Sequence, residues 1–175
     1  RASVGFARRG NFLEGEPEAV LLVETSGETE GEVAAKLEEV EKSLRRGGMG
    51  YAYVKMTDRE EQANVWEVRR ASIGLIMGIK GSAKPIPFIE DCAVSTDKLP
   101  EYIRRVDKMI RDNGTQAAYY GHASVGCIHV RPFINLKDQA DVDRMLKISS
   151  EACDLVLEMG GAMSGEHGDG LVRSM

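Results

Sequence analysis

Apolar and polar residues follow one another along this chain with periods that predict short strands and longer helices. Short apolar or alternating runs, typical of strands, occupy residues 19–25, 51–56, 85–94, 116–120 and 127–134. Longer runs with apolar residues three and four positions apart, typical of helices, occupy residues 29–46, 58–79, 97–111 and 139–159. With one further strand at the C-terminal end, the predicted order is β-α-β-α-β-α-β-β-α-β.

Residues that start and stop helices support these limits. Asp58 is suited to cap the second helix, and glycine pairs at 47–48 and 160–161 end the first and last helices. Residues 116–134 read as a hairpin, so the sheet is not all parallel. We therefore predict an α+β fold that is ferredoxin-like, with a mostly antiparallel sheet covered on one side by helices.

Length and composition indicate one globular domain within a larger protein. The chain has 175 residues, of which 42% are hydrophobic and 29% charged. Residues 1–18 mix glycine, proline and charge without a period, so we interpret them as a leading segment or linker and residues 19–175 as the domain. The chain begins with Arg1 instead of methionine, which indicates a piece of a longer polypeptide.

Charge and cysteine content limit the partners and the compartment. The net charge of -5 gives no reason to expect nucleic acid or an anionic membrane as a partner. No apolar run approaches the ~20 residues that span a bilayer. Three cysteines without paired spacing disfavour a disulfide framework. We expect a cytoplasmic protein, either free or peripheral on the inner membrane face.

All three histidines lie in two glycine-rich segments, residues 121–129 and 160–170. His122 and His129 are seven residues apart, which on an unbroken strand would place them on opposite faces of a sheet. Gly126 allows a turn or bulge that could let both imidazoles converge. Two histidines and a carboxylate would form a three-ligand metal site with open positions, the pattern of a catalytic metal. Each histidine taken alone is also explained by an ordinary turn; all three together favour a site.

The second segment adds a carboxylate directly before its histidine. Glu166 and His167 project in opposite directions on extended backbone, so one could bind metal while the other faces a substrate. Cys127 is either a softer fourth ligand or a cysteine buried beside a strand. Asp169 either hydrogen-bonds a ligand histidine or belongs to the turn.

Four ordered motifs resemble those of the C-terminal domain of FAD-linked oxidases and dehydrogenases that act on 2-hydroxy acids. This family includes D-lactate dehydrogenases, the glycolate oxidase FAD subunit and D-2-hydroxyglutarate dehydrogenase. Besides the two histidine segments, the motifs are a Trp-Glu-Val-Arg helix at 66–69 and a Glu-Asp-Cys-Ala-Val strand within 87–94. The likeness spans roughly residues 19–174.

The resemblance implies a substrate-binding cap that closes over FAD held by an N-terminal domain of the parent chain. It implies that His122, His129 and Glu166 hold a divalent metal, Zn or Mn, which binds the substrate's carboxylate and hydroxyl. It also implies that His167 is the base that takes the hydroxyl proton as hydride leaves for the flavin, and that Arg69 pairs with a substrate carboxylate. No FAD-binding residues are assigned within this chain, which lacks a Gly-x-Gly-x-x-Gly signature.

One departure from the family points to a subgroup. Many members have Gly-Asp-Gly-Asn between the two histidines, whereas this chain has residues 124–127 as Ser-Val-Gly-Cys, and Arg131 follows the second histidine. This variant resembles the large members that add a C-terminal iron–sulfur domain, D-2-hydroxyglutarate dehydrogenases among them. Glu90 stands near the position where some hydroxyglutarate enzymes carry a lysine.

Other polar and aromatic residues have plain structural explanations. Trp66 is suited to pack on a helix face, and Arg69 could form a solvated ion pair. Glu90 and Asp91 alternate faces on a strand, so we expect one salt bridge and one solvated carboxylate.

The sequence thus predicts the substrate- and metal-binding domain of an FAD-dependent dehydrogenase that oxidises a 2-hydroxy acid to the 2-oxo acid. Without the FAD domain it should be inert. The alternatives are a stand-alone ferredoxin-like module that binds a metal or metabolite for regulation, and a metal-dependent hydrolase that uses the same histidines.

Overall fold

A computed structural model describes residues 12–168 and 170–173 of the chain. Asp169 and the first eleven residues of the predicted leading segment lie outside the described residues. The chain divides into two compact units, residues 1–75 and 76–175, and each is described by itself. The predicted boundary between residues 18 and 19 stays a prediction.

The first unit contains α2 (Glu30–Arg46) and most of α3 (Arg59–Met77), which confirms both predicted helices. Thr29 Oγ1 accepts a hydrogen bond from the backbone N–H of Glu32 at 3.2 Å and so caps α2. Asp58 Oδ1 accepts one from Glu60 N–H at 2.8 Å at the start of α3. Neither these nor the other described helices are long and apolar enough to cross a membrane.

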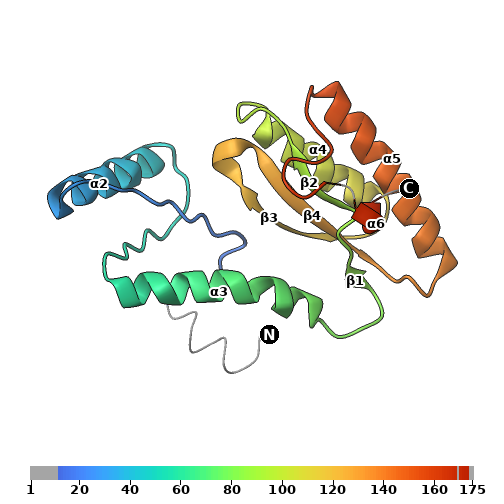
Figure 1. Cartoon of the computed structure of the whole chain (residues 1–175), viewed down its shortest axis with the longest axis horizontal. Helices are drawn as coiled ribbons and strands as arrows, with labels where there is room; N and C mark the ends of the chain where they lie inside the picture. Colours follow the sequence, from blue (N-terminus) through green and yellow to red (C-terminus); the bar gives the residue numbers. More distant parts are fainter. Residues whose placement is uncertain (1–11, 169, 174–175) are drawn as a thin grey trace. The chain divides into compact units, whose positions relative to one another are not determined.

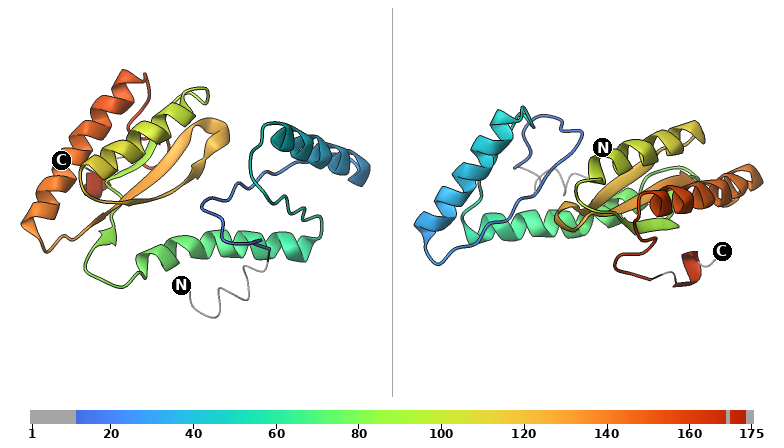
Figure 2. Two further views of the ribbon diagram at one scale, coloured as in Figure 1. Left: turned by 180° about the vertical axis from the view of Figure 1, so that it is seen from behind. Right: turned by 90° about the horizontal axis from the view of Figure 1, so that it is seen from above.

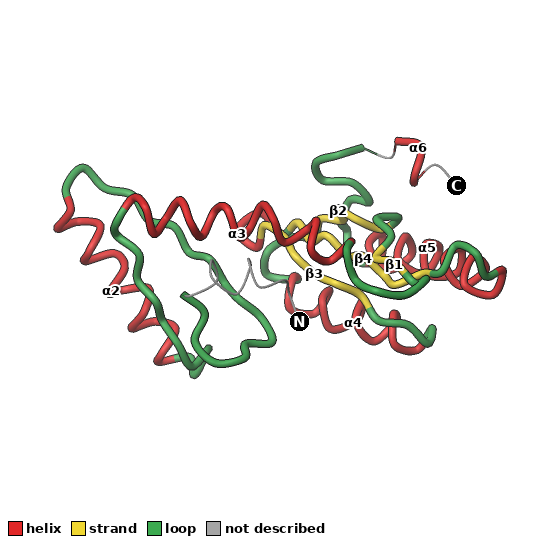
Figure 3. Tube along the Cα trace, turned by 90° about the horizontal axis from the view of Figure 1, so that it is seen from below, coloured by secondary structure: helices red, strands yellow, loops and turns green. Residues whose placement is uncertain are grey.

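The two strands predicted in this unit, at 19–25 and 51–56, are wrong. Both segments are irregular, and Figure 3 shows them as loops before and after α2. The apolar side chains at positions 20–23 are 45% to 64% exposed. A strand is stable only when a neighbouring strand accepts and donates its backbone hydrogen bonds. Within the described residues neither segment has such a neighbour, so neither forms a strand despite its strand-like composition.

The second unit is a four-stranded antiparallel sheet with two long helices (Figure 1). Its elements are β1 (Lys84–Pro85), β2 (Ile89–Ala93), α4 (Leu99–Asp112), β3 (Ala117–His122), the short 3-10 turn η1 (Ala123–Val125), β4 (Cys127–Ile134), α5 (Gln139–Glu158) and α6 (Gly170–Arg173). The central strand β4 pairs with β1, β2 and β3. The predicted strand 85–94 is interrupted where Pro87 lacks the N–H that a continuous ladder requires.

The two faces of β4 differ in what they carry. Ile128, Val130 and Ile134 join one apolar cluster with the buried sides of α4 and α5. Figure 2 shows these two helices lying against the sheet. Because side chains alternate along a strand, His129 and Arg131 point to the opposite face. The α+β class with an antiparallel sheet and helices is confirmed.

After α5 the chain returns to the free edge of β2. Among the described residues, the strand-type pairing at this edge is a single antiparallel bridge between Ala93 and Ala162. The predicted last strand is therefore reduced to one bridge. The segment from β2 onward follows the order β-α-β-β-α, and the ferredoxin-like description stays a prediction because only this bridge stands at its fourth strand.

Candidate functional site

The loop after α5, residues 160–168, is fixed against β2 by backbone hydrogen bonds. Ala93 and Ala162 exchange two of them, at 2.8 and 2.9 Å, and Gly165 N–H donates to the carbonyl of Asp91 at 2.8 Å. A Cβ on Gly161 would lie 2.4 Å from the Ala93 carbonyl oxygen. The glycine at this position therefore permits the close approach of loop and strand.

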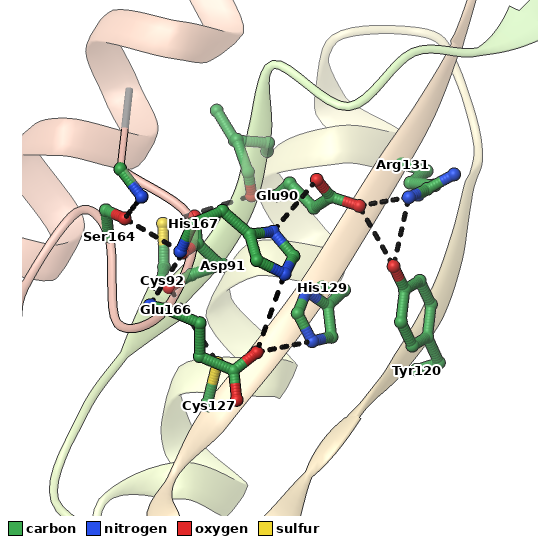
Figure 4. Close-up of polar contacts among 12 residues, drawn as sticks. Glu90, Asp91, Cys92, Tyr120, Cys127, His129, Arg131, Ser164, Glu166 and His167 are labelled. Atoms are coloured by element: carbon green, nitrogen blue, oxygen red, sulfur yellow. Dashed lines mark hydrogen bonds and ion pairs between the residues drawn. The ribbon is translucent and has the colours of Figure 1, made fainter. Parts of the chain in front are cut away.

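Asp91 fixes the part of this loop that carries the predicted site residues. It is fully buried, and its Oδ2 atom accepts hydrogen bonds from Ser164 Oγ at 2.8 Å, Glu166 N–H at 2.9 Å and His167 N–H at 2.7 Å (Figure 4). A carboxylate that accepts from consecutive backbone amides holds those residues in one conformation. The side chains of Glu166 and His167 are thereby directed over the sheet.

The β3–β4 hairpin brings the other two histidines together. Its turn ends at Gly126, which has a φ of +70°, a conformation that favours glycine. In the hairpin register His122 pairs with Cys127, and Tyr120 pairs with His129. The rings of His122 and His129 lie edge to face with centroids 5.5 Å apart. The turn thus lets histidines at an odd spacing converge, which an unbroken strand would not.

Glu166 reaches both of these histidines. Its Oε1 lies 3.6 Å from His122 Nε2, and its Oε2 lies 3.4 Å from His129 Nε2 and 3.8 Å from His167 Nε2. His122, His129 and Glu166 offer ligand atoms that all lie within 4.8 Å of one another. Two imidazoles and a carboxylate at this spacing fit a divalent metal, and the exposure of His122 and Glu166, at 38% and 36%, leaves room for a further ligand.

A second group of three, Glu90, His129 and His167, also satisfies this spacing. Here Glu90 accepts hydrogen bonds from Arg131 and Tyr120, so a cation would compete with an arginine for the same carboxylate. The chemistry of the donors therefore favours the group that contains Glu166.

His129 is the buried member of the set, with 1% of its surface exposed. Its ring stacks on Tyr120 with centroids 4.3 Å apart and an angle of 18° between the planes. Burial lowers the pKa of His129 below its usual value, although Glu90 and Glu166 act in the opposite direction. The ring is therefore neutral near pH 7, the form in which imidazole binds a metal.

Glu90 and Asp91 correct the sequence interpretation of this strand. The predicted salt bridge is present, between Glu90 and Arg131, but the predicted solvated carboxylate is wrong, since Glu90 is 6% and Asp91 0% exposed. The register of β2 against β4 shifts between Ile89 and Asp91, and this bulge breaks the alternation of faces on which the interpretation depended. Both carboxylates therefore point into the site.

Glu90 connects three neighbours. Tyr120 Oη donates a hydrogen bond to its Oε1 at 2.9 Å, Arg131 Nη2 donates to the same oxygen, and His167 Nδ1 lies 3.4 Å from Oε2. Burial alone would raise the pKa of Glu90, but the hydrogen bonds from Arg131 and Tyr120 outweigh it and the pKa is lowered. Burial and the Glu90 carboxylate raise the pKa of Tyr120 to about 12. Glu90 is therefore an anion and Tyr120 a neutral donor near neutral pH.

The other residues considered from the sequence have simpler environments. Cys127 is buried, its Sγ lies 3.8 Å from the Asp91 carbonyl oxygen, and burial followed by Glu166 raises its pKa to about 11. Its burial agrees with the buried-cysteine alternative, and neither of the two candidate metal-ligand groups among the described residues includes it. Arg69 lies on α3 in the first unit, where its guanidinium is 5.5 Å from the centroid of the Trp66 ring. Its role toward substrate stays a prediction.

Three polar residues of this cluster were not predicted as site residues: Tyr120, Arg131 and Ser164. The loop-fixing role of Asp91 was not predicted either. Arg131 had a usable signal, since it follows His129 by two positions and shares its strand face. Tyr120 required the hairpin register, and Ser164 and Asp91 are 73 residues apart in sequence, so no local pattern links them.

The fold and this cluster define an α+β domain that presents histidines and carboxylates on one face of its sheet, and comparison with known proteins identifies its class. The family model of FAD linked oxidases, C-terminal domain, matches residues 2–175, so the chain belongs to this family. The predicted resemblance is confirmed.

The chain is similar to several enzymes of known name. It is 36% identical over 122 residues to the D-2-hydroxyglutarate dehydrogenase of Haemophilus influenzae, a match that covers 70% of this chain and 12% of that protein. It is 32% identical to the D-2-hydroxyglutarate dehydrogenase of Pantoea ananatis, with 85% of this chain and 15% of that protein covered. It is 24% identical to the glycolate oxidase subunit GlcD of Bacillus subtilis, with 89% and 32% covered. The chain thus spans only about an eighth to a third of the length of these relatives.

Proposed function

We propose that this chain is the substrate- and metal-binding domain of an FAD-dependent dehydrogenase that oxidises a 2-hydroxy acid, of the D-lactate, glycolate or D-2-hydroxyglutarate type, to the 2-oxo acid. The observation that carries this proposal is the convergence of His122, His129, Glu166 and His167 on one face of the sheet. Membership of the FAD linked oxidase family supports it over a regulatory module or a hydrolase.

His122, His129 and Glu166 would hold a divalent cation, Zn or Mn. When bound, such an ion supplies a Lewis acid for the substrate's hydroxyl and carboxylate oxygens. The neutral state of His129 and the half-exposed positions of His122 and Glu166 support this role, since one side of the set stays accessible to a small acid.

His167 would take the hydroxyl proton. Its Nε2 lies 3.8 Å from Glu166 Oε2, so a hydroxyl held at the metal set would be next to this nitrogen. Imidazole is the side chain best suited to accept a proton near neutral pH. Arg69 would pair with a substrate carboxylate, as the resemblance implies.

FAD would come from an N-terminal domain of the parent protein and would accept the hydride. The family description and the much greater length of the relatives support a flavin-binding partner domain. We extend the proposal to an iron–sulfur domain in the parent and to a cytoplasmic location, in both cases from sequence alone. An FAD-binding domain encoded upstream in the same reading frame is expected; its absence would contradict this proposal.

Metal binding is tested by calorimetric titration of the chain with Mn²⁺ and with Zn²⁺. We expect His122→Ala and Glu166→Ala each to weaken metal binding at least about 10-fold. Loss of a residue that only hydrogen-bonds a metal ligand already lowers metal affinity by about 10- to 100-fold. Glu39→Ala, which removes an exposed glutamate of α2, is the control and should bind like the unaltered chain. If neither site substitution weakens binding, the ligand set is wrong.

The chain alone should not oxidise 2-hydroxy acids, because the redox step belongs to the flavin. Turnover of D-lactate, glycolate or D-2-hydroxyglutarate without an added flavin domain would contradict the proposal. Hydrolysis by the chain with only Zn²⁺ or Mn²⁺ added would favour the hydrolase alternative.

A further inference from the structure

Glu90 is a buried carboxylate that has no role in the proposed function, since it belongs neither to the metal set nor to the proposed base. It lies on β2 at the bulge, 6% exposed, on the same face of the sheet as His129 and His167. Burial of a carboxylate costs free energy unless hydrogen-bond donors pair with it. The partners of Glu90 therefore indicate its role.

The two oxygens of Glu90 have different neighbours. Oε1 accepts from Tyr120 Oη and from Arg131 Nη2, and the Arg131 guanidinium lies 5.3 Å from the Tyr120 ring centroid. These donors fix the rotation of the carboxylate about its own axis. As a result Oε2 is the oxygen that faces His167 Nδ1, at 3.4 Å (Figure 4).

The ring of His167 lies between two carboxylates. Its Nδ1 faces Glu90 and its Nε2 faces Glu166, whose nearest oxygen is farther away, at 3.8 Å (Figure 4). The ring also stacks on His129 with centroids 5.3 Å apart and an angle of 21° between the planes. The Glu90 contact is both the shorter and the more buried of the two, since Glu90 is 7% and Glu166 36% exposed at the side chain.

We propose that Glu90 is the positioning residue that sets the tautomer of His167. A neutral imidazole has one N–H, and an ionised carboxylate only accepts hydrogen bonds, so the proton of His167 lies on Nδ1 and is donated to Glu90. Nε2 is left unprotonated and directed toward the metal set. This inference rests on the proposed function in one respect, namely that the unprotonated Nε2 is the base.

The tautomer is measured directly from the ¹⁵N shifts of the histidine rings in the ¹⁵N-labelled chain, at about pH 8.5, roughly 2 units above the reference pKa of imidazole. The chain has three histidines, so His167→Ala assigns the signal. We expect the Nδ1–H form in the unaltered chain. If the unaltered chain shows the Nε2–H form of His167, the proposal is overturned before any Glu90 variant is measured.

Glu90→Gln provides the sharper test. Arg131 and Tyr120 still donate to the oxygen at this position, so the amide NH₂ faces His167 Nδ1 and donates to it. The expected result is a switch of His167 to the Nε2–H form, which blocks the proposed base. Tyr120→Phe removes one donor to Glu90 but keeps the carboxylate beside His167, and it should show the tautomer of the unaltered chain. An unchanged tautomer in a folded Glu90→Gln variant would overturn the inference.

Kinetics of the FAD-containing parent protein separate this inference from the proposed function. Glu90→Gln should lower kcat about 10- to 100-fold, the usual effect of removing an outer partner, with KM near that of the unaltered protein. If His167→Ala abolishes turnover while Glu90→Gln does not change it, only the role of Glu90 is wrong. If His167→Ala leaves turnover unchanged, the proposed base is wrong, and the tautomer result still decides what Glu90 does.

Discussion

The site depends on carboxylates that have distinct tasks although they lie close together. Glu166 faces the histidines from the exposed side of the site, Glu90 is paired with Arg131 and Tyr120, and Asp91 binds backbone amides. Environment, not residue type, separates them, because each carboxylate meets a different set of donors. At the residue scale the chemistry therefore follows from which donors the fold brings to each oxygen.

Asp91 provides a prediction at this scale. Asp91→Ala removes the acceptor of three hydrogen bonds and leaves the N–H groups of Glu166 and His167 without it, so we expect the free energy of unfolding to fall by about 3 kcal/mol. Urea unfolding followed by circular dichroism measures the loss. Asp154→Ala, at an exposed position of α5, should change it by less than about 0.5 kcal/mol. Equal stabilities of the two variants would show that Asp91 does not hold the loop.

At the scale of elements, the helices and the hairpin could be predicted from the sequence. α2, α3, α4 and α5 have the predicted periodicity within a few residues at each end, and β3 and β4 form the predicted hairpin. The strand predictions failed more often: the segments at 19–25 and 51–56 are irregular, the strand at 85–94 is interrupted, and the last strand is reduced to one bridge. The bulge in β2 was not predicted either. A helix makes its hydrogen bonds within its own segment, whereas a strand depends on a partner elsewhere, so local pattern determines helices better than strands.

The hairpin turn provides a prediction at this scale. Gly126 and Gly114 both have a positive φ, of +70° and +72°, but a Cβ on Gly126 would lie 1.8 Å from the Val94 carbonyl oxygen, whereas one on Gly114 meets nothing within 4 Å. Gly114→Ala should cost about 1 kcal/mol, the conformational penalty alone. Gly126→Ala should cost at least about 2 kcal/mol more, because the turn must also move away from Val94.

The midpoints of thermal or urea unfolding of these two alanine variants give the difference. Gly114→Ala is the matched control, since it has the same backbone conformation without the close contact. Equal losses would mean that the turn does not approach Val94 closely in solution.

At the scale of the whole molecule, the two units differ in how many apolar side chains they bury. None of the residues of α2 is buried, whereas β2, β4, α4 and α5 supply the residues of one apolar cluster. Resistance to local opening increases with buried apolar contacts. The two units should therefore differ in the stability of their backbone hydrogen bonds.

Hydrogen exchange followed by mass spectrometry measures this difference. Peptides from α2 should exchange at least about 100-fold faster than peptides from β4 and α5. Comparable protection of α2 would show that its surface is covered in solution.

The sequence by itself determined the helices, the hairpin and the choice of histidines and Glu166 as candidate site residues, since each depends on periodicity or on residues close together in the chain. The tertiary structure decided that the loop at 160–168 lies on β2, that the bulge directs Glu90 and Asp91 into the site, and that Glu90 faces His167. These relationships join residues up to 77 positions apart, as in the contact of Glu90 with His167. Local spacing carries no information about such contacts, because they form only when the sheet brings distant segments together.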